Sequence, residues 1–140
     1  MTKKTAKPLL SCLLAAALMA GLCLNASAIT YPNSYWPLQD QWISASEAKD
    51  PDQIISVTQR IYDLLIPYGL DQDVCYNLEP KCGMTSWAYE IKGDLDNAVL
   101  WLNRQVELER WLADNVGGYL DAIQNNEARL RYLEAARNPA

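Results

Sequence analysis

Histidine does not occur anywhere in this chain of 140 residues. Its absence removes the commonest general base of enzymes and the commonest side chain that binds transition metals. Catalytic triads that contain histidine and zinc sites that need an imidazole are therefore excluded. The sequence also has no nucleophile motif, no glycine-rich phosphate loop and no cofactor fingerprint. We therefore expect no enzymatic activity, no cofactor and no metal site.

Basic residues are scarce after residue 28. The whole chain has 12 basic and 17 acidic residues, and the first 28 residues contain three lysines and no acidic residue. The remainder is therefore acidic, with nine basic and 17 acidic residues and a net charge of −8. Such a charge argues against a nucleic-acid partner, whose phosphates require a basic surface. A pair of carboxylates can hydrolyse a glycoside, but among 17 acids some pair is unavoidable and indicates nothing.

The N-terminus has the pattern of a secretory signal peptide over residues 1–28. After the lysines comes an apolar run, Leu9 to Leu24, and then Ala26-Ser27-Ala28, which has the small side chains of a cleavage site. We predict cleavage at this point and a secreted or otherwise extracytoplasmic protein. The run is shorter than the roughly 20 residues of a membrane span, so no stable span is expected afterwards. An uncleaved anchor, and lipoprotein processing at Cys12 or Cys23, are the alternatives.

Hydrophobic periodicity predicts an all-α domain. Phenylalanine is absent, β-branched runs are scarce, and no window shows the alternation of a strand. Residues 29–37, rich in Pro, Tyr and Asn, are expected to form an extended lead-in to a helical domain over residues 38–137. The predicted helices are Leu38 to Lys49, Pro51 to Leu65, Lys81 to Lys92, Leu95 to Asn115 and Leu120 to Arg137. Between the second and third of them, residues 67–80 are expected to form a long loop that could hold a short helical turn.

The two longest predicted helices differ in how much of their circumference is apolar. Residues 95–115 are apolar over more than half of it, so this helix must be buried on two sides. The residues concerned are Ala98, Trp101, Leu102, Val106, Leu108, Trp111 and Leu112. Residues 120–137 have a thinner apolar face and a polar opposite side, as a terminal helix should. The pattern indicates stacked helices with the last one as a cap.

Two cysteines, Cys75 and Cys82, follow the predicted signal peptide. Their spacing of seven residues is not typical of metal ligands. In an oxidising compartment they could close a short loop as a disulfide, since Pro80 and Gly83 allow a turn. Two separate thiols at helix ends are the alternative.

The stretch Glu79 to Leu112 has the length of one tetratricopeptide repeat, 34 residues. Tyr89 falls on the tyrosine of the first helix of that repeat, Gly93-Asp94 on the turn, and Ala98 on the small residue of the second helix. Leu102 takes the large apolar position that follows. This stretch therefore resembles the tetratricopeptide family.

Several positions depart from the family pattern. Cys82 stands where tryptophan is expected, Thr85-Ser86 replace Leu-Gly, and Arg110 stands in place of a proline. The earlier helix pair, residues 38–65, is similar only as helix–turn–helix. The resemblance covers about a quarter of the chain well, and an unrelated five-helix bundle is the alternative.

The resemblance implies stacked antiparallel helix pairs, about two of them plus a C-terminal capping helix. It also implies a non-catalytic protein–protein interaction module whose unidentified protein or peptide partner lies on the first helix of each pair. The groove positions of the family fall on Gly83, Trp87, Glu90 and Ile91. Trp87 is the sharpest prediction, because an accessible tryptophan makes a strong anchor. Its helical stripe also includes Met84 and Ile91, so a core position is the competing interpretation.

A second functional class is a cell-wall or glycan-binding accessory module. The aromatic residues free to stack on sugars would be Tyr31, Tyr35 and Trp36, whereas Trp42 and Trp101 lie on apolar helical stripes. The chain could also be the N-terminal part of a longer secreted enzyme, because a short repeat array is near the lower limit of stability.

Overall fold

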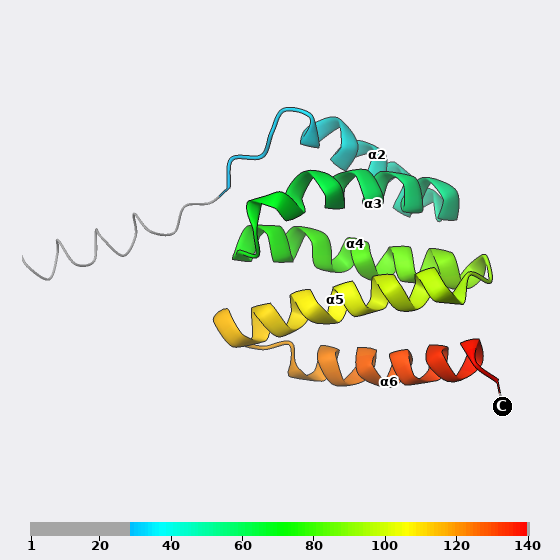
Figure 1. The fold of residues 1–140 in the computed structure, drawn as a ribbon. Helices are drawn as coiled ribbons and strands as arrows, with labels where there is room; N and C mark the ends of the chain where they lie inside the picture. Colours follow the sequence, from blue (N-terminus) through cyan, green and yellow to red (C-terminus); the bar gives the residue numbers. More distant parts are fainter. Residues whose placement is uncertain (1–28, 140) are drawn as a thin grey trace, which may run out of the picture.

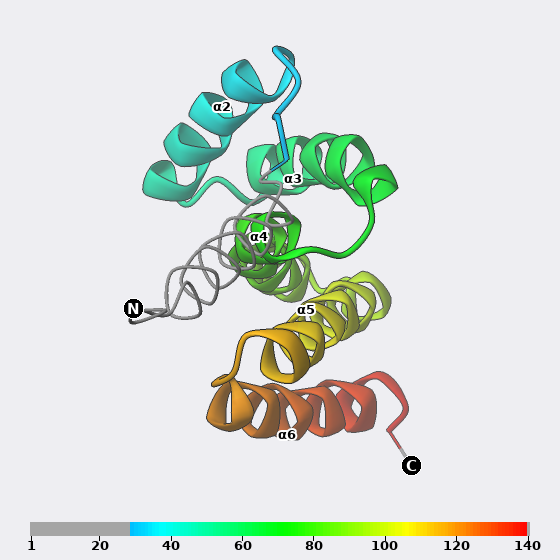
Figure 2. The ribbon, with the colours of Figure 1, turned by 90° about the vertical axis from the view of Figure 1, so that its left-hand side faces the viewer.

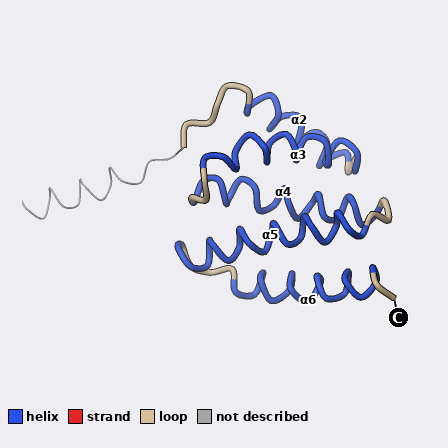
Figure 3. Tube along the Cα trace, viewed as in Figure 1, coloured by secondary structure: helices blue, strands red, loops and turns tan. Residues whose placement is uncertain are grey.

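The computed structural model describes residues 29–139. The predicted signal peptide and its cleavage site, residues 1–28, lie outside the described residues. Within residues 29–139 the structure is all-α and contains no strand, as predicted (Figure 3). Its elements are α2 (Tyr35–Ala48), α3 (Pro51–Leu65), the 3₁₀ turn η1 (Ile66–Tyr68), α4 (Gln72–Ile91), α5 (Leu95–Asn115) and α6 (Leu120–Arg137).

The helices stack in chain order, each antiparallel to the next (Figure 1). The contact between α4 and α5 is the most extensive, and α6 covers the far side of α5. In a view roughly along the helices, α3 and α5 are displaced to the same side of α2 and α4 (Figure 2). The stack therefore has two faces, one formed by α2 and α4 and the other by α3 and α5.

Helix α2 begins three residues earlier than predicted, so the extended lead-in ends at Ser34. Tyr35 is buried in the main core and stacks on Tyr31, with the ring centroids 4.4 Å apart. Pro37 lies in the first turn, where a helix makes no use of the backbone N–H that proline lacks. Pro37, which led to the prediction of an extended segment, is thus compatible with an α-helix at this position.

The prediction of a loop over residues 67–80 was wrong beyond Asp71. The side chain of Asp71 accepts a hydrogen bond from the Val74 backbone N–H at 2.8 Å and caps α4. Pro80 lies inside the helix. It removes one backbone hydrogen bond, but a buried apolar stripe on the same helix favours the helical conformation. This stripe consists of Val74, Cys75, Leu78 and Cys82.

Helix α5 is buried on both sides, which confirms the expectation from its broad apolar surface. Trp101, Leu108 and Leu112 belong to the main core shared with α2, α3 and α4. Ala98, Leu102 and Val106 belong to a second cluster that α6 completes. Only Leu130 and Leu133 of α6 are buried.

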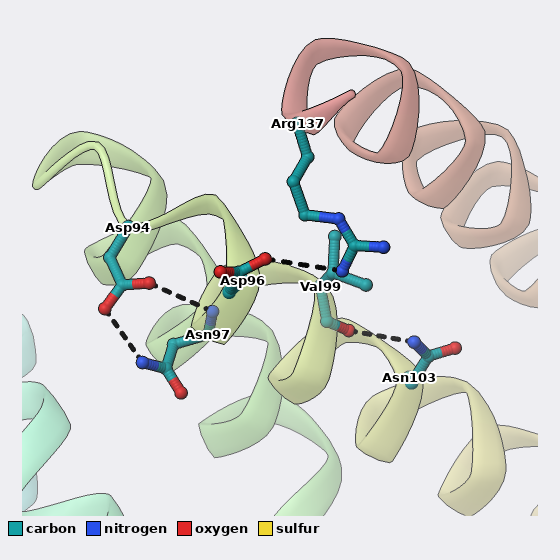
Figure 4. Close-up of polar contacts among 6 residues, drawn as sticks. All are labelled: Asp94, Asp96, Asn97, Val99, Asn103 and Arg137. Atoms are coloured by element: carbon teal, nitrogen blue, oxygen red, sulfur yellow. Dashed lines mark hydrogen bonds and ion pairs between the residues drawn. The ribbon is translucent and has the colours of Figure 1, made fainter. Parts of the chain in front are cut away.

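The turn between α4 and α5 forms as the sequence indicates. Gly93 has a positive φ of 76°, and Asp94 accepts hydrogen bonds from the backbone N–H and the side-chain amide of Asn97, at 3.1 and 2.8 Å. On the same turn, Asp96 forms an ion pair with Arg137 at 3.5 Å (Figure 4). The end of α6 is thereby tied to the start of α5.

Candidate functional site

The residues predicted to bind a partner all lie in the C-terminal half of α4, but only two of them share a cavity. Gly83 and Trp87, together with Met84 and Lys49, line a groove of about 340 Å³. Lys49 ends α2, so the groove lies between the first helix of one pair and the first helix of the next. The remaining two residues, Glu90 and Ile91, do not line it.

Trp87 is half-buried, so part of its ring belongs to the packed interior and part remains accessible. With Met84 it packs against a small cluster contributed by α2, α3 and α4, namely Ala45, Ile54 and Ala88. Its remaining surface faces the groove. A tryptophan held by packing and still accessible is pre-organised for contact with a partner.

Gly83 has a structural role that the sequence did not reveal. A Cβ atom at this position would lie 2.7 Å from Oε1 of Gln105 on α5. A side chain at position 83 would therefore have to displace the Gln105 amide, which favours glycine here.

Glu90 and Ile91 lie toward the end of α4. Glu90 accepts a charge-assisted hydrogen bond from Arg129 on α6, and both side chains are about one-third exposed. This contact ties α6 to α4 across the stack. Ile91, at 56% exposure, is among the more exposed large apolar side chains of the described residues.

A second and larger groove, of about 430 Å³, lies between α2 and α3, and the sequence analysis did not single it out. Ala45 and Ala48 contribute apolar surface to it, whereas Asp40 and Asp50 contribute carboxylates. Ala45 also belongs to the cluster under Trp87. Gln41, Ser44 and Gln53 complete the lining. The only sequence signal for this groove is the polar and small-residue stripe of α2.

No family model, curated protein or solved structure matches this chain.

The aromatic residues at the N-terminus are less accessible than expected for a glycan site. Tyr35 is buried and belongs to the core, which contradicts its predicted freedom. Tyr31 is half-buried, and its hydroxyl donates a hydrogen bond to the Asp73 carbonyl at 3.4 Å. Trp36 is 56% exposed and is the one ring of the three that solvent reaches broadly.

The disulfide between Cys75 and Cys82 is incompatible with the structure. Both are buried free thiols on α4, seven residues apart, which places them about 10 Å apart along the helix axis. A disulfide requires Cα atoms within about 7 Å. Burial raises the pKa of Cys75 to about 11 and that of Cys82 to about 12. Both are therefore protonated and unreactive at neutral pH.

Within residues 29–139, no helix combines the length and the apolar character needed to cross a membrane. In the same range, no three cysteine or acidic side chains cluster in a way that could hold a metal ion.

Proposed function

We propose that this chain is an exported, non-catalytic interaction module, similar to a tetratricopeptide scaffold, that binds a protein or peptide partner on the face formed by α2 and α4. The observation that carries the proposal is the groove of about 340 Å³ lined by Lys49, Gly83, Met84 and Trp87. It combines an apolar wall, a half-buried aromatic anchor and one lysine at the rim. Such a combination is typical of the centre of a protein interface.

The composition of the groove favours a partner segment with an apolar side chain and an acceptor group. Trp87 and Met84 offer apolar and polarisable surface, and methionine adapts to differently shaped partners. Among the described residues, Lys49 has no acidic side chain within ion-pair distance. Its ammonium group is therefore available to a carboxylate or carbonyl of the partner.

The decisive experiment compares two tryptophans. The secreted form of the protein is used to capture exported and envelope proteins, in parallel with Trp87→Ala and the matched control Trp36→Ala. We expect a specific protein partner that is lost with Trp87→Ala and kept with Trp36→Ala. A photo-crosslinking residue at Met84 should then join covalently to that partner, which locates the contact.

A glycan-binding accessory module is the second candidate, and the exposure of Trp36 favours it. An exposed tryptophan can stack on a sugar ring, as aromatic residues of carbohydrate-binding proteins do. This candidate predicts the opposite result: retention on peptidoglycan or polysaccharide that Trp36→Ala abolishes and Trp87→Ala leaves unchanged. If the chain is the N-terminal part of a longer secreted enzyme, either surface would serve to position that enzyme.

A further inference from the structure

A layer of polar side chains crosses the interior of the stack where α4, α5 and α6 meet. At its centre lies Glu109 of α5, which has no exposed surface. Its Oε1 accepts hydrogen bonds from Asn126 of α6 at 2.7 Å and from Gln105 at 3.2 Å. Gln105 also donates to Glu79 of α4 at 2.7 Å. Because Gly83 has no side chain, the Gln105 amide can occupy the space next to the α4 backbone.

This layer brings two carboxyl groups together without a positive charge between them. Oε2 of Glu109 is buried and has no hydrogen-bond partner in the structure. A proton on Glu109 would supply a hydrogen-bond donor toward Glu79. The two carboxyl groups therefore attract each other when they hold one proton and repel each other when they hold none. Burial and the neighbouring Glu79 carboxyl group raise the pKa of Glu109 to about 7, although the hydrogen bonds from Asn126 and Gln105 act in the opposite direction.

The groups that surround Glu109 do not offset its charge. Helix α4 contributes Glu79 and, farther away, Tyr76, whose ring lies 6.4 Å from that of Tyr119 in the α5–α6 turn. Helix α6 contributes the neutral Asn126. The neighbouring arginines of α5 are engaged elsewhere. Arg104 lies 4.4 Å from the rings of Tyr62 and Trp101, and Arg110 forms an ion pair with Glu127 at 2.6 Å.

The connection between α5 and α6 has the geometry of a hinge. Gly117, Gly118 and Tyr119 have consecutive positive φ angles of 99°, 80° and 68°. Two glycines in this region allow rotation at low cost, and the left-handed conformation of Tyr119 is one that non-glycine residues adopt less readily. An open surface depression of about 550 Å³ lies beside this turn and is lined by Gly118, Tyr119, Leu120, Asp121 and Ala122.

Tyr119 of this turn packs against the main core, and its ring lies beside that of Tyr76 on α4. Burial and the charges of Glu79, Tyr76 and Glu109 raise its pKa.

Helix α6 is held by a small apolar contact and by several polar contacts. It buries only Leu130 and Leu133. Its other ties to the stack are the Asn126–Glu109 hydrogen bond and the ion pairs of Glu127, Arg129 and Arg137. Partly exposed ion pairs contribute little stability each. The protonation state of the buried Glu109 can therefore decide whether α6 stays packed on α5.

We propose that α6 is a proton-controlled cover: it lies on α5 while Glu79 and Glu109 share one proton, and it swings away about Gly117–Tyr119 when that proton is lost. Its release uncovers the apolar surface of α5 formed by Ala98, Val99, Leu102 and Val106. Because docking raises the pKa of Glu109 from about 4.5 to about 7, docking is strongest below about pH 4.5, weakens as the pH rises from there to about 7, and changes little above that.

The test measures the carboxyl titration and the docking of α6 in the same samples by NMR, from about pH 4.5 to about pH 9. In the wild type, the side-chain carboxyl carbon of Glu109 should titrate with a midpoint near 7. After correction for intrinsic exchange rates, the amides of residues 120–137 should lose at least about tenfold in protection over this range relative to those of α5. Glu109→Gln should keep α6 protected at both ends of the range.

Two further variants keep the test decisive. Glu79→Gln removes the repulsion while leaving Glu109 in place, so the midpoint should fall and α6 should stay protected at higher pH. Glu107→Gln makes the same chemical change at an exposed position of α5 and should behave as the wild type. Protection of α6 that does not change with pH in the wild type would overturn the proposal. So would a pH-dependent loss that persists in both Glu109→Gln and Glu79→Gln.

Discussion

The ammonium group of Lys81 lies 4.7 Å from the centroid of the Trp42 ring. It also donates a hydrogen bond to the Asn77 carbonyl at 3.1 Å, and the residue is only 3% exposed. No acidic side chain of the described residues forms an ion pair with it. A cation–π contact and one carbonyl replace its hydration shell incompletely, and burial lowers the pKa of Lys81 to about 8.

The buried lysine should therefore destabilise the fold at neutral pH. The unfolded chain keeps the proton up to about pH 10.5, whereas the folded chain releases it from about pH 8. The contribution of Lys81 to stability should accordingly become less unfavourable as the pH increases through this window, whereas Cys75 and Cys82 act in the opposite direction above about pH 9. Lys81→Met should raise the free energy of unfolding at pH 7 by about 1–3 kcal/mol, and this difference from the wild type should shrink toward pH 10. Urea titrations at about pH 7 and pH 10 measure both effects, and a less stable Lys81→Met protein at pH 7 would contradict this account.

Gly83→Ala tests the contact between α4 and the Gln105 side chain. Alanine in a helix interior is favoured over glycine by about 1 kcal/mol, so an unconstrained site would gain stability. Because the Gln105 amide is held by Glu79 and Glu109, the added Cβ at 2.7 Å has to displace it. We expect a net loss of about 1 kcal/mol or more in the free energy of unfolding.

A double-mutant cycle supplies the control for Gly83→Ala. In a Gln105→Ala background the obstacle is gone, and the same substitution should then stabilise the protein by about 1 kcal/mol. Equal effects in both backgrounds would show that Gln105 does not constrain position 83.

The thiols of Cys75 and Cys82 should be present and protected in the native protein. Both are buried, and their raised pKa values keep them protonated. In a protein that begins at residue 29, neither thiol should react with a thiol-specific reagent under native conditions, and both should react in denaturant. If none reacts in denaturant until a reductant is added, the thiols are oxidised and the placement of residues 72–82 in one helix is wrong.

The helices with local start and stop signals could be predicted from the sequence. Gly93-Asp94 and Gly117-Gly118 mark the ends of α5 and the start of α6, and the predicted bounds of both helices agree with the structure. The start of α4 was missed, because Pro80 was interpreted as a loop residue while Asp71 was not recognised as a cap. Tertiary burial of the stripe that includes Val74 and Leu78 outweighs the local cost of the proline.

The groove was predicted in part and the polar layer was not predicted. Gly83 and Trp87 were found through the resemblance to a repeat, which places groove positions on one helix. Glu79, Gln105 and Asn126 lie 26 and 21 residues apart along the chain, and each resembles an ordinary surface residue when seen alone. Only the stacking of three helices brings them to Glu109, so no local pattern could reveal them.

Pro80 and Pro37 form a matched pair for measuring the cost of the interior proline. Pro80 lies in the ninth position of α4, where it removes a backbone hydrogen bond and strains the preceding turn. Pro37 lies in the first turn of α2, where no such bond exists. Pro80→Ala should therefore raise the free energy of unfolding by about 1–3 kcal/mol, and Pro37→Ala should change it by less than about 0.5 kcal/mol. Thermal and urea denaturation monitored by circular dichroism compare the two variants, both of which replace an exposed proline on a helix surface. If both substitutions change the free energy of unfolding equally, α4 is not continuous through Pro80. The effect of each proline would then arise in the unfolded chain rather than in the helix.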